Sequence, residues 1–546
     1  MMRRFSRRMF GSLLLSTLAV PAVQAAQRVW DVIVVGAGGA GLSAAVSAAE
    51  AGAKVLLLEK MPHIGGNTRI SGGFYACVDL VRQKRQGIED SEQLFLSQML
   101  ESGGGHANPK LAAILVHNAT PALKWLEKLG MRFQPTVSEA YGSRWPRSHK
   151  PLMPNGEGYI RTLSTAAVKL GVIIKTSTPV TTLLTDNDGR VCGVQIAENN
   201  IRKNIFSKRG VIVASGGFGA NPAMIARYAP QFSGLTTNNM PGSTGEMLLA
   251  AQKAGAELVD MEDVLCNPGL PPGRVMRARF HMLVDQFILV DQTGRRFIRE
   301  DASRAAVTRA ILALPGKVAY TIIDSKGMKN LSILMQKEAV LAVESGDAWT
   351  ADTIEDLARL MKLPAANLQA TIDDYNTGMK TGQDPLGKVA PRGDFSLDHP
   401  PYWACFAGMS IHYTMGGIRI NELAQAMRAD GRPVAGLWAA GEATGGIHGK
   451  ERLGGNGIND AVVFGRIAGQ QAARDNDMDH PPTQCVTTKR CAIMGVYQPR
   501  RKSMSCQRRI HAMRWIRRSR TPSSASILLR QTAPLQRCLV PMTTLG

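Results

Sequence analysis

DVIVVGAGGAGLSAAVSAAEAGAKVLLLE, residues 31–59, is the stretch that decides the fold of this chain. Its first part, Val32–Val35, is a short run of β-branched apolar residues, which is typical of a buried parallel strand. A glycine-rich turn follows, then the alanine-rich segment 42–51, which predicts a helix, and residues 54–58 predict a second strand. Strand, helix and strand in this order predict an α/β fold: a Rossmann-like domain with a parallel sheet and helices on its faces.

The turn between the first strand and the helix carries the pattern G-x-G-x-x-G at Gly36, Gly38 and Gly41. The first glycine permits a tight turn, the second lets a pyrophosphate approach the backbone, and the third lets the helix pack closely on the strand. The helix points its N-terminal amides at the phosphates. Glu59, at the tip of the second strand, can accept hydrogen bonds from ribose hydroxyls. The glycine pattern alone is weak evidence, but with the acid and both strands it predicts a dinucleotide site.

A second glycine cluster, GGNTRISGG at residues 65–73, follows soon after Glu59. Because glycine has no side chain, a glycine-rich segment lets a ligand approach the backbone closely, and this second cluster indicates further contact with an extended cofactor. A nicotinamide-binding unit would not need this contact, whereas FAD threaded along the domain would. Residues 211–219 predict another buried strand that ends in glycines, which fits a return of the sheet to the same cofactor.

Length and composition are those of a large globular protein. With 546 residues, of which 44% are hydrophobic and 20% charged, the chain can form two or more domains. Much of its net charge of +22 lies in residues 481–546, which hold 13 lysines and arginines and no acidic residue. The rest of the chain has no basic stripe, which excludes nucleic acid as the main partner. The eight cysteines form no C-x-x-C motif, so neither a metal site nor haem attachment is predicted.

Residues 1–26 are expected to be a targeting segment. A basic start is followed by the apolar stretch 11–20, which is too short to span a bilayer, and by small residues at 23–25 for a signal peptidase. Ser6–Phe10, SRRMF, resembles a twin-arginine export signal, whose pathway moves folded proteins and suits an enzyme that must first acquire its cofactor. An ordinary secretory signal is the alternative, and both predict a periplasmic protein. No later run predicts a transmembrane helix.

Five longer motifs make the chain similar to the flavoprotein family of soluble fumarate reductases. Its members include flavocytochrome c, the succinate dehydrogenase flavoprotein, L-aspartate oxidase and urocanate reductase. The similarity covers Val29 to Ala473 and rests on GGNTRISGG, ASGGFGANP, GRRFIREDASR, HYTMGG and GEATGGIHGKERLGGNGIND. It implies an FAD-binding domain interrupted by a mobile capping domain, which excludes water from the reduced flavin. The expected division is a signal peptide at 1–26, FAD-binding parts at 29–265 and 398–478, the cap at 266–397 and a tail at 479–546.

The resemblance and the glycine motifs together imply a set of cofactor contacts. FAD, bound without a covalent link, is expected to contact Gly36, Gly38, Gly41, Glu59, Lys60, Gly66, Asn67, Thr68, Gly72, Gly73, Val180, Ala214, Gly216, Gly217, Glu442, His448, Asn456, Gly457 and Ile458. In the family, the position of Glu442 implies contact with ribityl or ribose hydroxyls, and that of His448 a place near the isoalloxazine ring. A structural hydrogen bond is the alternative for His448.

The family chemistry, hydride transfer to a carbon–carbon double bond, needs a group that polarises the bond and a proton donor. His412 in HYTMGG and Arg452 in ERLGGN match the family residues that grip a substrate carboxylate. Arg304, at the end of G-x-R-F-x-x-E-x-x-x-R, matches the arginine that donates the proton. Arginine is an unusual donor because its pKa is so high. Alone, each would be read as a core histidine or a salt-bridged arginine, but the matched motifs favour function.

The other half of the family's substrate pocket is rewritten in this chain. Asn267 stands where a histidine is expected, Arg279–Phe280 replace a threonine–glutamate pair, and Leu283 replaces a relay arginine. His281 and Asp285 are the candidates for that relay. Neutral Asn267 can form hydrogen bonds but supplies no cation, which argues against a small dicarboxylate. We therefore expect an α,β-unsaturated acid whose far end is not a simple carboxylate, such as an aryl acrylate or a urocanate-like acid, and not fumarate itself.

Because the sequence has no haem motif, electrons are expected from a separate donor, such as a periplasmic cytochrome c or a quinol-linked protein. The leading interpretation is a respiratory enoate reductase. The alternatives are a fumarate reductase, a dehydrogenase of a saturated acid or ketosteroid, and a non-catalytic flavin electron carrier, which would have no use for a carboxylate clamp. Residues 481–546 are expected to be disordered, either as a basic docking tail or, preferably, as the product of a shifted reading frame.

Overall fold

The computed structural model describes residues 29–198, 201–389 and 395–475. The chain divides into two compact units, 1–488 and 489–546, and every described residue belongs to the first. The expected signal segment and the basic tail lie outside the described residues, so both stay predictions.

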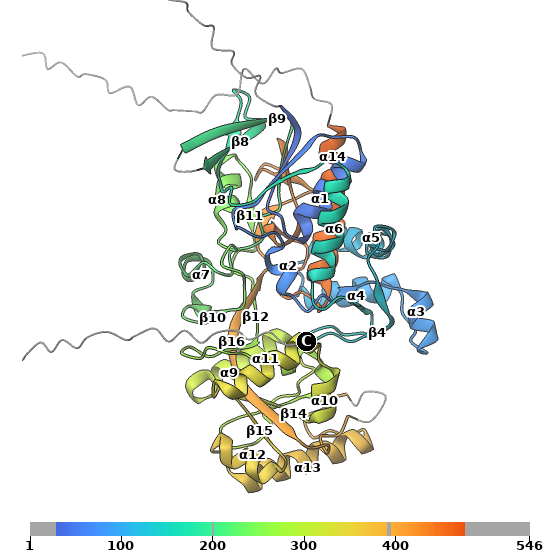
Figure 1. Ribbon diagram of the computed structural model, residues 1–546, viewed down its shortest axis with the longest axis vertical. Coiled ribbons are helices and arrows are strands. Elements are labelled where there is room, and N and C mark those ends of the chain that lie inside the picture. The colour runs from blue at the N-terminus through green and yellow to red at the C-terminus, as the bar shows by residue number, and fades with distance from the viewer. Residues whose placement is uncertain (1–28, 199–200, 390–394, 476–546) are drawn as a thin grey trace, which may run out of the picture. The chain divides into compact units, whose positions relative to one another are not determined.

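A mostly parallel sheet lies in the upper part of the first unit, around β9 (Figure 1), and its strands follow the order β18-β19-β9-β1-β2-β6. The strands are β1 (Trp30–Val35), β2 (Val55–Leu58), β6 (Ile173–Lys175), β9 (Ile201–Val213), β18 (Gln425–Met427) and β19 (Pro433–Ala439). Strand β1 pairs in parallel with β2 and β9, while only β18 joins antiparallel. All four residues of Val32–Val35 are buried, as an apolar strand with covered faces requires. The predicted α/β fold, a Rossmann-like domain with a parallel sheet and helices, is confirmed.

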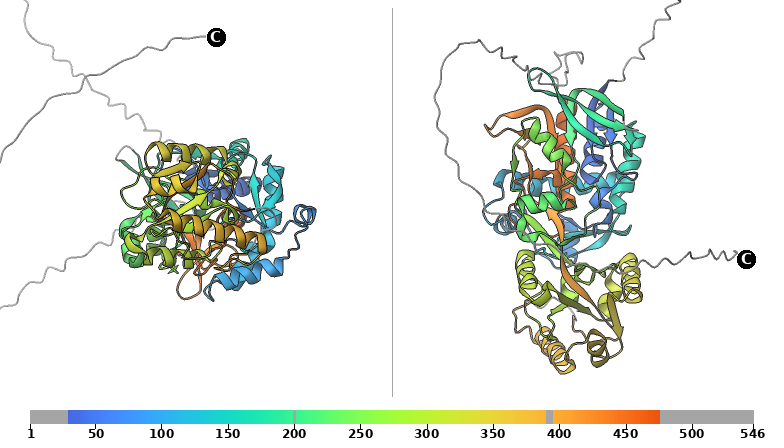
Figure 2. Two further views of the ribbon diagram at one scale, coloured as in Figure 1. Left: turned by 90° about the horizontal axis from the view of Figure 1, so that it is seen from below. Right: turned by 90° about the vertical axis from the view of Figure 1, so that its left-hand side faces the viewer.

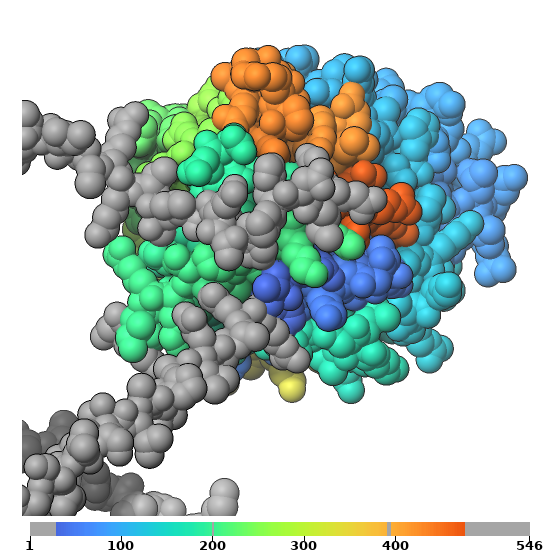
Figure 3. Space-filling view, turned by 90° about the horizontal axis from the view of Figure 1, so that it is seen from above, coloured from blue at the N-terminus to red at the C-terminus, as the bar shows by residue number. Residues whose placement is uncertain are grey.

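Helices and antiparallel strands surround this sheet. Helix α1 (Gly39–Glu50) is buried over most of its length because its small side chains let α14 (Asn456–Arg474) pack against it. Strands β7 (Val180–Thr185) and β8 (Val191–Glu198) extend β9 as an antiparallel ribbon. The remaining helices here are α2 (Gly66–Ile70), α3 (Leu80–Arg85), α4 (Glu92–Ser102), α5 (Pro109–Lys128), α6 (Glu157–Lys169), α7 (Pro222–Tyr228) and α8 (Glu246–Lys253). In the view from above, segments from both ends of the described chain, in blue and orange, share one face (Figure 3).

A second sheet is built around the long strand β16 (Tyr402–Thr414), which runs down through the lower part of the unit (Figure 2). Its partners are β10 (Thr236–Thr237), β12 (Val264–Gly269), β14 (Ala319–Ile323) and β15 (Ala348–Ala351), and β13 (Ile288–Val290) pairs with β14. The helices of this part are α9 (Arg304–Ala313), α10 (Ser325–Asn330), α11 (Ile333–Glu344), α12 (Ile354–Met361) and α13 (Ala365–Thr381). Several of these elements share an apolar core of their own. The domain boundaries inferred from the sequence stay a prediction.

Short strands complete the unit in two small sheets: β3 (Tyr75–Ala76), β4 (Phe133–Ser138) and β5 (Ser148–Pro151) in one, and β11 (Leu258–Val259), β17 (Gly417–Arg419) and β20 (Thr444–Gly445) in the other. Among the described residues, no helix has the length and apolar character needed to cross a membrane.

We predict that Gly41→Ala removes the cofactor site, because a Cβ at Gly41 would lie 1.8 Å from the carbonyl oxygen of Gly36. Helix α1 would have to move off the turn, so we expect unfolding to become easier by more than about 2 kcal/mol. The flavin-to-protein ratio after purification and the melting temperature measure both effects.

Gly52→Ala at the other end of α1 is the matched control. A Cβ there meets nothing within 4 Å, although the φ of +85° makes alanine less stable. It should lower the melting temperature only modestly and keep FAD. Full flavin content in Gly41→Ala would contradict the assigned packing.

Candidate active site

A cavity of about 740 Å³ brings together side chains from distant parts of the chain. Its wall is formed by the turn after β1, the stretch after β2, strands β12 and β16 and the start of α14. The volume lies within the range of roughly 300–1,000 Å³ that is usual for ligand pockets. Most residues proposed from the sequence as cofactor or substrate contacts lie on this wall, so it is the candidate active site.

The start of α1 and the carboxylate of Glu59 form one part of the wall. Gly38 is the N-cap of α1 and lines the cavity, which places the positive end of the helix dipole there. The Glu59 carboxylate is held by two backbone donors: the N–H of Ala37 donates to Oε2 and that of Met61 to Oε1, both at 2.8 Å. A fixed carboxylate beside a helix N-terminus fits the ribose and pyrophosphate of a dinucleotide.

Most of the proposed cofactor residues line this cavity. They are Gly36, Gly38, Glu59, Lys60, Gly66, Asn67, Thr68, Gly72, Gly73, Val180, Ala214, Gly216, Glu442, Gly457 and Ile458. Glu442 is half-buried and joins two of the elements, since its Oε1 accepts the Thr414 N–H at 3.1 Å and its Oε2 accepts Asn67 Nδ2 at 3.3 Å. Burial raises the pKa of Glu442 to about 7, so this carboxyl can hydrogen-bond as donor or acceptor near neutral pH.

Four of the proposed cofactor residues do not line the cavity. Gly41 packs on Gly36, and Gly217 packs against Thr414 and Glu442. His448 lies beside Tyr413, and its Nε2 is 3.1 Å from an oxygen of Asp460. Asn456 is fully buried at the first turn of α14. The cofactor roles of Gly41, Gly217, His448 and Asn456 therefore stay predictions, and the pairing of His448 with Asp460 corresponds to the structural alternative.

Arg304 lies on the cavity wall at the first turn of α9, where it is buried. Its backbone N–H donates to Glu451 Oε1 at 2.6 Å, and its Nη2 donates to the carbonyl of Arg452. Gly142 makes room for the guanidinium, because a Cβ at that position would lie 2.2 Å from Arg304 Nε. The side chain is thus fixed by its surroundings, although no described carboxylate forms an ion pair with it.

Arg452 and His412 line the same cavity and are also buried or nearly so. The guanidinium of Arg452 lies over the Tyr413 ring at 4.4 Å, and its Nη1 donates to the Leu453 carbonyl at 3.0 Å. On His412, Nδ1 donates to Asn238 Oδ1 at 3.1 Å. No described carboxylate forms an ion pair with either side chain, so both are available to bind an anionic ligand.

The three side chains act on one another through their charges. Burial, followed by the charge of Arg452, lowers the pKa of Arg304 to about 9. Burial lowers the pKa of Arg452, and burial with the two arginine charges holds the pKa of His412 well below its usual range. His412 is therefore neutral in the free protein. The Nε atoms of Arg304 and Arg452 are buried without a hydrogen-bond partner among the described residues.

The rewritten half of the pocket is only partly on the cavity wall. Asn267 on β12 pairs with Ser410 on β16, both line the cavity, and Asn267 Oδ1 is buried without a described partner. His281 also lines the cavity, and burial with nearby arginines lowers its pKa to about 3. Asp285, in the next short 3-10 turn, Val284–Gln286, does not line the cavity. Of the two candidates for the proton relay, His281 therefore lies on the cavity wall and Asp285 does not.

Tyr141 and Arg277 are among the cavity residues that the sequence did not single out. Tyr141 contacts His281 edge-on at 5.4 Å between ring centres, and its hydroxyl is buried without a described partner. Nothing in the sequence near Tyr141 indicates this role. Arg277 also lines the cavity. The pattern R-x-R, formed by Arg277 and Arg279, is the sequence feature that could have indicated it.

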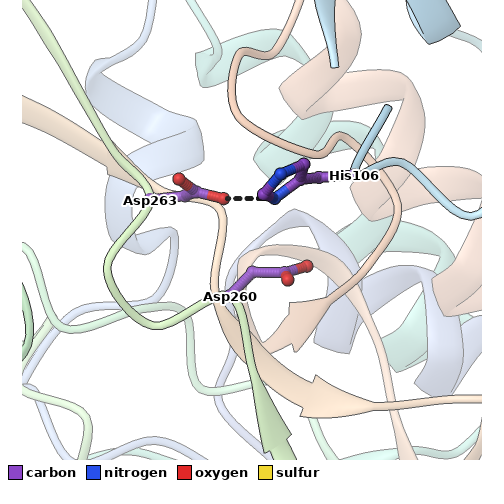
Figure 4. Close-up of side chains that lie close together, drawn as sticks. All are labelled: His106, Asp260 and Asp263. Carbon is purple, nitrogen blue, oxygen red and sulfur yellow. Dashed lines mark ion pairs between the residues drawn. The ribbon is translucent and has the colours of Figure 1, made fainter. Parts of the chain in front are cut away.

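A cluster of titratable side chains outside the cavity wall is formed by His106, Asp260 and Asp263 (Figure 4). Nδ1 of His106 lies 4.0 Å from Oδ2 of Asp263. Burial and the charge of Asp260 raise the pKa of Asp263 to about 6. The cluster is a local ion-pair group, and we assign it no part in the cavity chemistry.

Comparison with known proteins agrees with the site. Residues 31–458 match the family model described as an FAD binding domain. The chain is 34% identical over 450 residues to a probable fumarate reductase of Shewanella frigidimarina, covering 81% of this chain and 75% of the relative. It is 34% identical over 459 residues to a urocanate reductase of Eggerthella lenta, covering 81% and 74%. The solved open conformation of a flavocytochrome c3 fumarate reductase matches with a TM-score of 0.67 and 34% identity, over 83% of this chain and 80% of that one. The chain therefore belongs to the family of FAD-dependent oxidoreductases that contains the fumarate and urocanate reductases.

Proposed function

We propose that this protein reduces the carbon–carbon double bond of an α,β-unsaturated carboxylate other than fumarate. The observation that carries the proposal is the group of Arg304, His412 and Arg452 on one cavity wall without carboxylate partners among the described residues. Buried arginines without an ion-pair partner are unfavourable, so two of them beside a histidine are expected where an anionic ligand completes the group. A flavin electron carrier would have no need for this arrangement.

Arg452 and His412 hold the substrate carboxylate in this proposal. The fork of Arg452 suits bidentate binding of a carboxylate. In neutral His412 the proton sits on Nδ1, facing Asn238, so Nε2 can donate to the carboxylate only after taking up a second proton. The negative charge of the ligand favours that uptake. Both cations then stabilise the charge that moves toward the carboxylate as the double bond is attacked.

FAD, once bound and reduced by two electrons from the separate donor, would supply the hydride that adds to the β carbon. Arg304 supplies the proton for the α carbon: a guanidinium N–H bond breaks, a C–H bond forms, and a neutral guanidine remains. An arginine at its ordinary pKa would be a poor acid. Burial and the neighbouring Arg452 lower the pKa to about 9, which brings this proton much closer to the working range.

The substrate's far end meets Asn267, His281 and Tyr141. Asn267 and Tyr141 are uncharged, and the low pKa of His281 keeps it neutral near neutral pH. Fumarate, whose second carboxylate lies two carbons from the first, would find no cation among these three. This supports the choice of a longer acid, with aryl acrylates and urocanate-like acids as the starting candidates.

We infer further that the protein is exported to the periplasm and receives electrons from a separate donor, such as a cytochrome c or a quinol-linked protein. The support is the twin-arginine pattern in the first ten residues and the lack of a haem motif in the sequence. The export segment lies outside the described residues.

The proton-donor role predicts a pH limit. Because Arg304 must carry its proton to donate it, kcat/KM for the unsaturated acid should fall tenfold per pH unit above about 9. Anaerobic stopped-flow oxidation of the reduced flavin measures this limb. Oxidation of the same flavin by ferricyanide needs no proton from Arg304 and should show no such limb. A flat profile for the acid up to pH 10.5 would remove Arg304 from the donor role.

The reaction itself is tested by reducing the flavin without oxygen and adding a panel of unsaturated acids. Reoxidation by acids other than fumarate is expected. Arg304→Ala should slow it at least a hundredfold, the usual contribution of a general acid, and leave the flavin spectrum unchanged. Arg309→Ala, at an exposed position on the same helix, is the matched control and should react normally.

Two outcomes of this panel would contradict the proposal. If fumarate alone reoxidises the flavin, the substrate assignment is wrong. If no acid reoxidises it, the protein is a flavin carrier and the reductase assignment fails.

A further inference from the structure

Five arginines line the cavity, and they differ in whether a carboxylate neutralises them. They are Arg274, Arg277, Arg279, Arg304 and Arg452. Arg279 forms two hydrogen bonds to Glu338, at 2.7 and 2.9 Å, and Arg274 lies 3.5 Å from Asp347. Arg304 and Arg452 belong to the proposed reaction site. Arg277 remains as a cation with no ion-pair partner among the described residues: the charge of Glu338 acts on it, but that carboxylate is hydrogen-bonded to Arg279.

Arg277 forms no hydrogen bond or ion pair with the rest of the described chain, although it is half-buried in the cavity wall. Burial, and then the adjacent charge of Arg279, lower its pKa. A guanidinium offers five N–H donors in a planar fork that matches a carboxylate. Leaving such a group partly desolvated and unpaired is unfavourable, so its natural complement is an anion inside the cavity.

The backbone on both sides of Arg277 is fixed. The N–H groups of Val275 and Met276 both donate to Asp347 Oδ2, at 3.0 and 2.8 Å. Two residues further on, Arg279 is fixed by its two bonds to Glu338. The guanidinium of Arg277 is therefore presented from an anchored stretch. Anchoring in advance reduces the entropy that binding would lose.

The charge of Arg277 reaches the proposed reaction site. It contributes to the lowered pKa of His412 and of His281, in both cases together with the charge of Arg304. Arg277 therefore lines the same cavity as His412 and His281 and is close enough for its charge to act on both.

We propose that Arg277 binds a second carboxylate of the substrate, at the end remote from the reacting double bond. This inference rests on the proposed function and narrows it: the substrate is an extended unsaturated diacid, such as a carboxyaryl acrylate. It revises the expectation from the sequence, where neutral Asn267 suggested a far end without charge. In the resemblance to the family, Asn267 stands at the position of the substrate-binding histidine and carries no charge. Arg277 supplies a cation at a different position on the cavity wall.

The test compares acids with and without the remote carboxylate on two variants. The pairs are cinnamate with 4-carboxycinnamate and crotonate with a longer unsaturated diacid, assayed on the flavin-loaded protein. Arg277→Gln should lower kcat/KM for the diacids about tenfold to a hundredfold, as expected for loss of a charged hydrogen-bonded pair, and change the monoacids less than threefold. Arg277→Lys keeps the positive charge but loses the planar guanidinium, so its kcat/KM for the diacids should lie between those of the wild type and of Arg277→Gln. If Arg277→Gln does not fold, Arg277→Lys still tests the inference.

Arg309→Gln is the charge-matched control, because it removes the same charge at an exposed residue that does not line the cavity. It should leave the preference for diacids unchanged.

Binding without reaction separates this inference from the proposed function. Dissociation constants of the saturated acids, 3-phenylpropionate and its 4-carboxy form, are measured by calorimetry on the oxidised protein. Weaker binding of only the diacid in Arg277→Gln supports the inference even if no unsaturated acid is reduced. Normal reduction with an unchanged diacid preference would overturn it and leave the reductase proposal standing. Loss of FAD from Arg277→Gln would assign this arginine to the cofactor and also overturn the inference.

Discussion

Positive charge that the protein leaves unpaired inside its own cavity is the constraint on which the rest of the site depends. Arg304 and Arg452 are buried side by side, and each lacks a carboxylate partner among the described residues. Their repulsion, with burial, lowers the pKa of Arg304 to about 9 and keeps His412 neutral. One carboxylate entering this region would relieve all three groups. The same electrostatic imbalance would therefore account for both parts of the proposal, the binding of an acid and the donation of a proton by an arginine.

The fold places these unpaired cations at one cavity because it brings together elements that are far apart in the sequence. Arg304 is fixed by the start of α9 and by the space over Gly142, while His412 comes from β16 and Arg452 from the turn before α14. The same cavity offers carboxylates and helix amides near Glu59. A dinucleotide with hydroxyls and phosphates suits that part of the wall, and an acid suits the cationic part.

The fold and much of the site could be predicted from the sequence because short local motifs specify both. The run Val32–Val35 with its glycine turn specifies a buried strand and a tight helix approach, and the structure has both. Motifs also led to Arg304, His412 and Arg452, and all three line the cavity. Tyr141 could not be found in this way, because its place depends on contacts with His281 and Arg304, far along the chain. The pairing of His448 with Asp460, 12 residues further along the chain, is likewise a tertiary contact that the motif does not specify.

A structure of the flavin-loaded protein with a saturated carboxylic acid bound would test the central claim most directly. The account predicts one carboxylate within hydrogen-bond distance of both Arg452 and His412, with the guanidinium of Arg304 next to the carbon adjacent to that carboxylate. A carboxylate bound elsewhere in the cavity, with Arg452 and His412 both untouched, would contradict it.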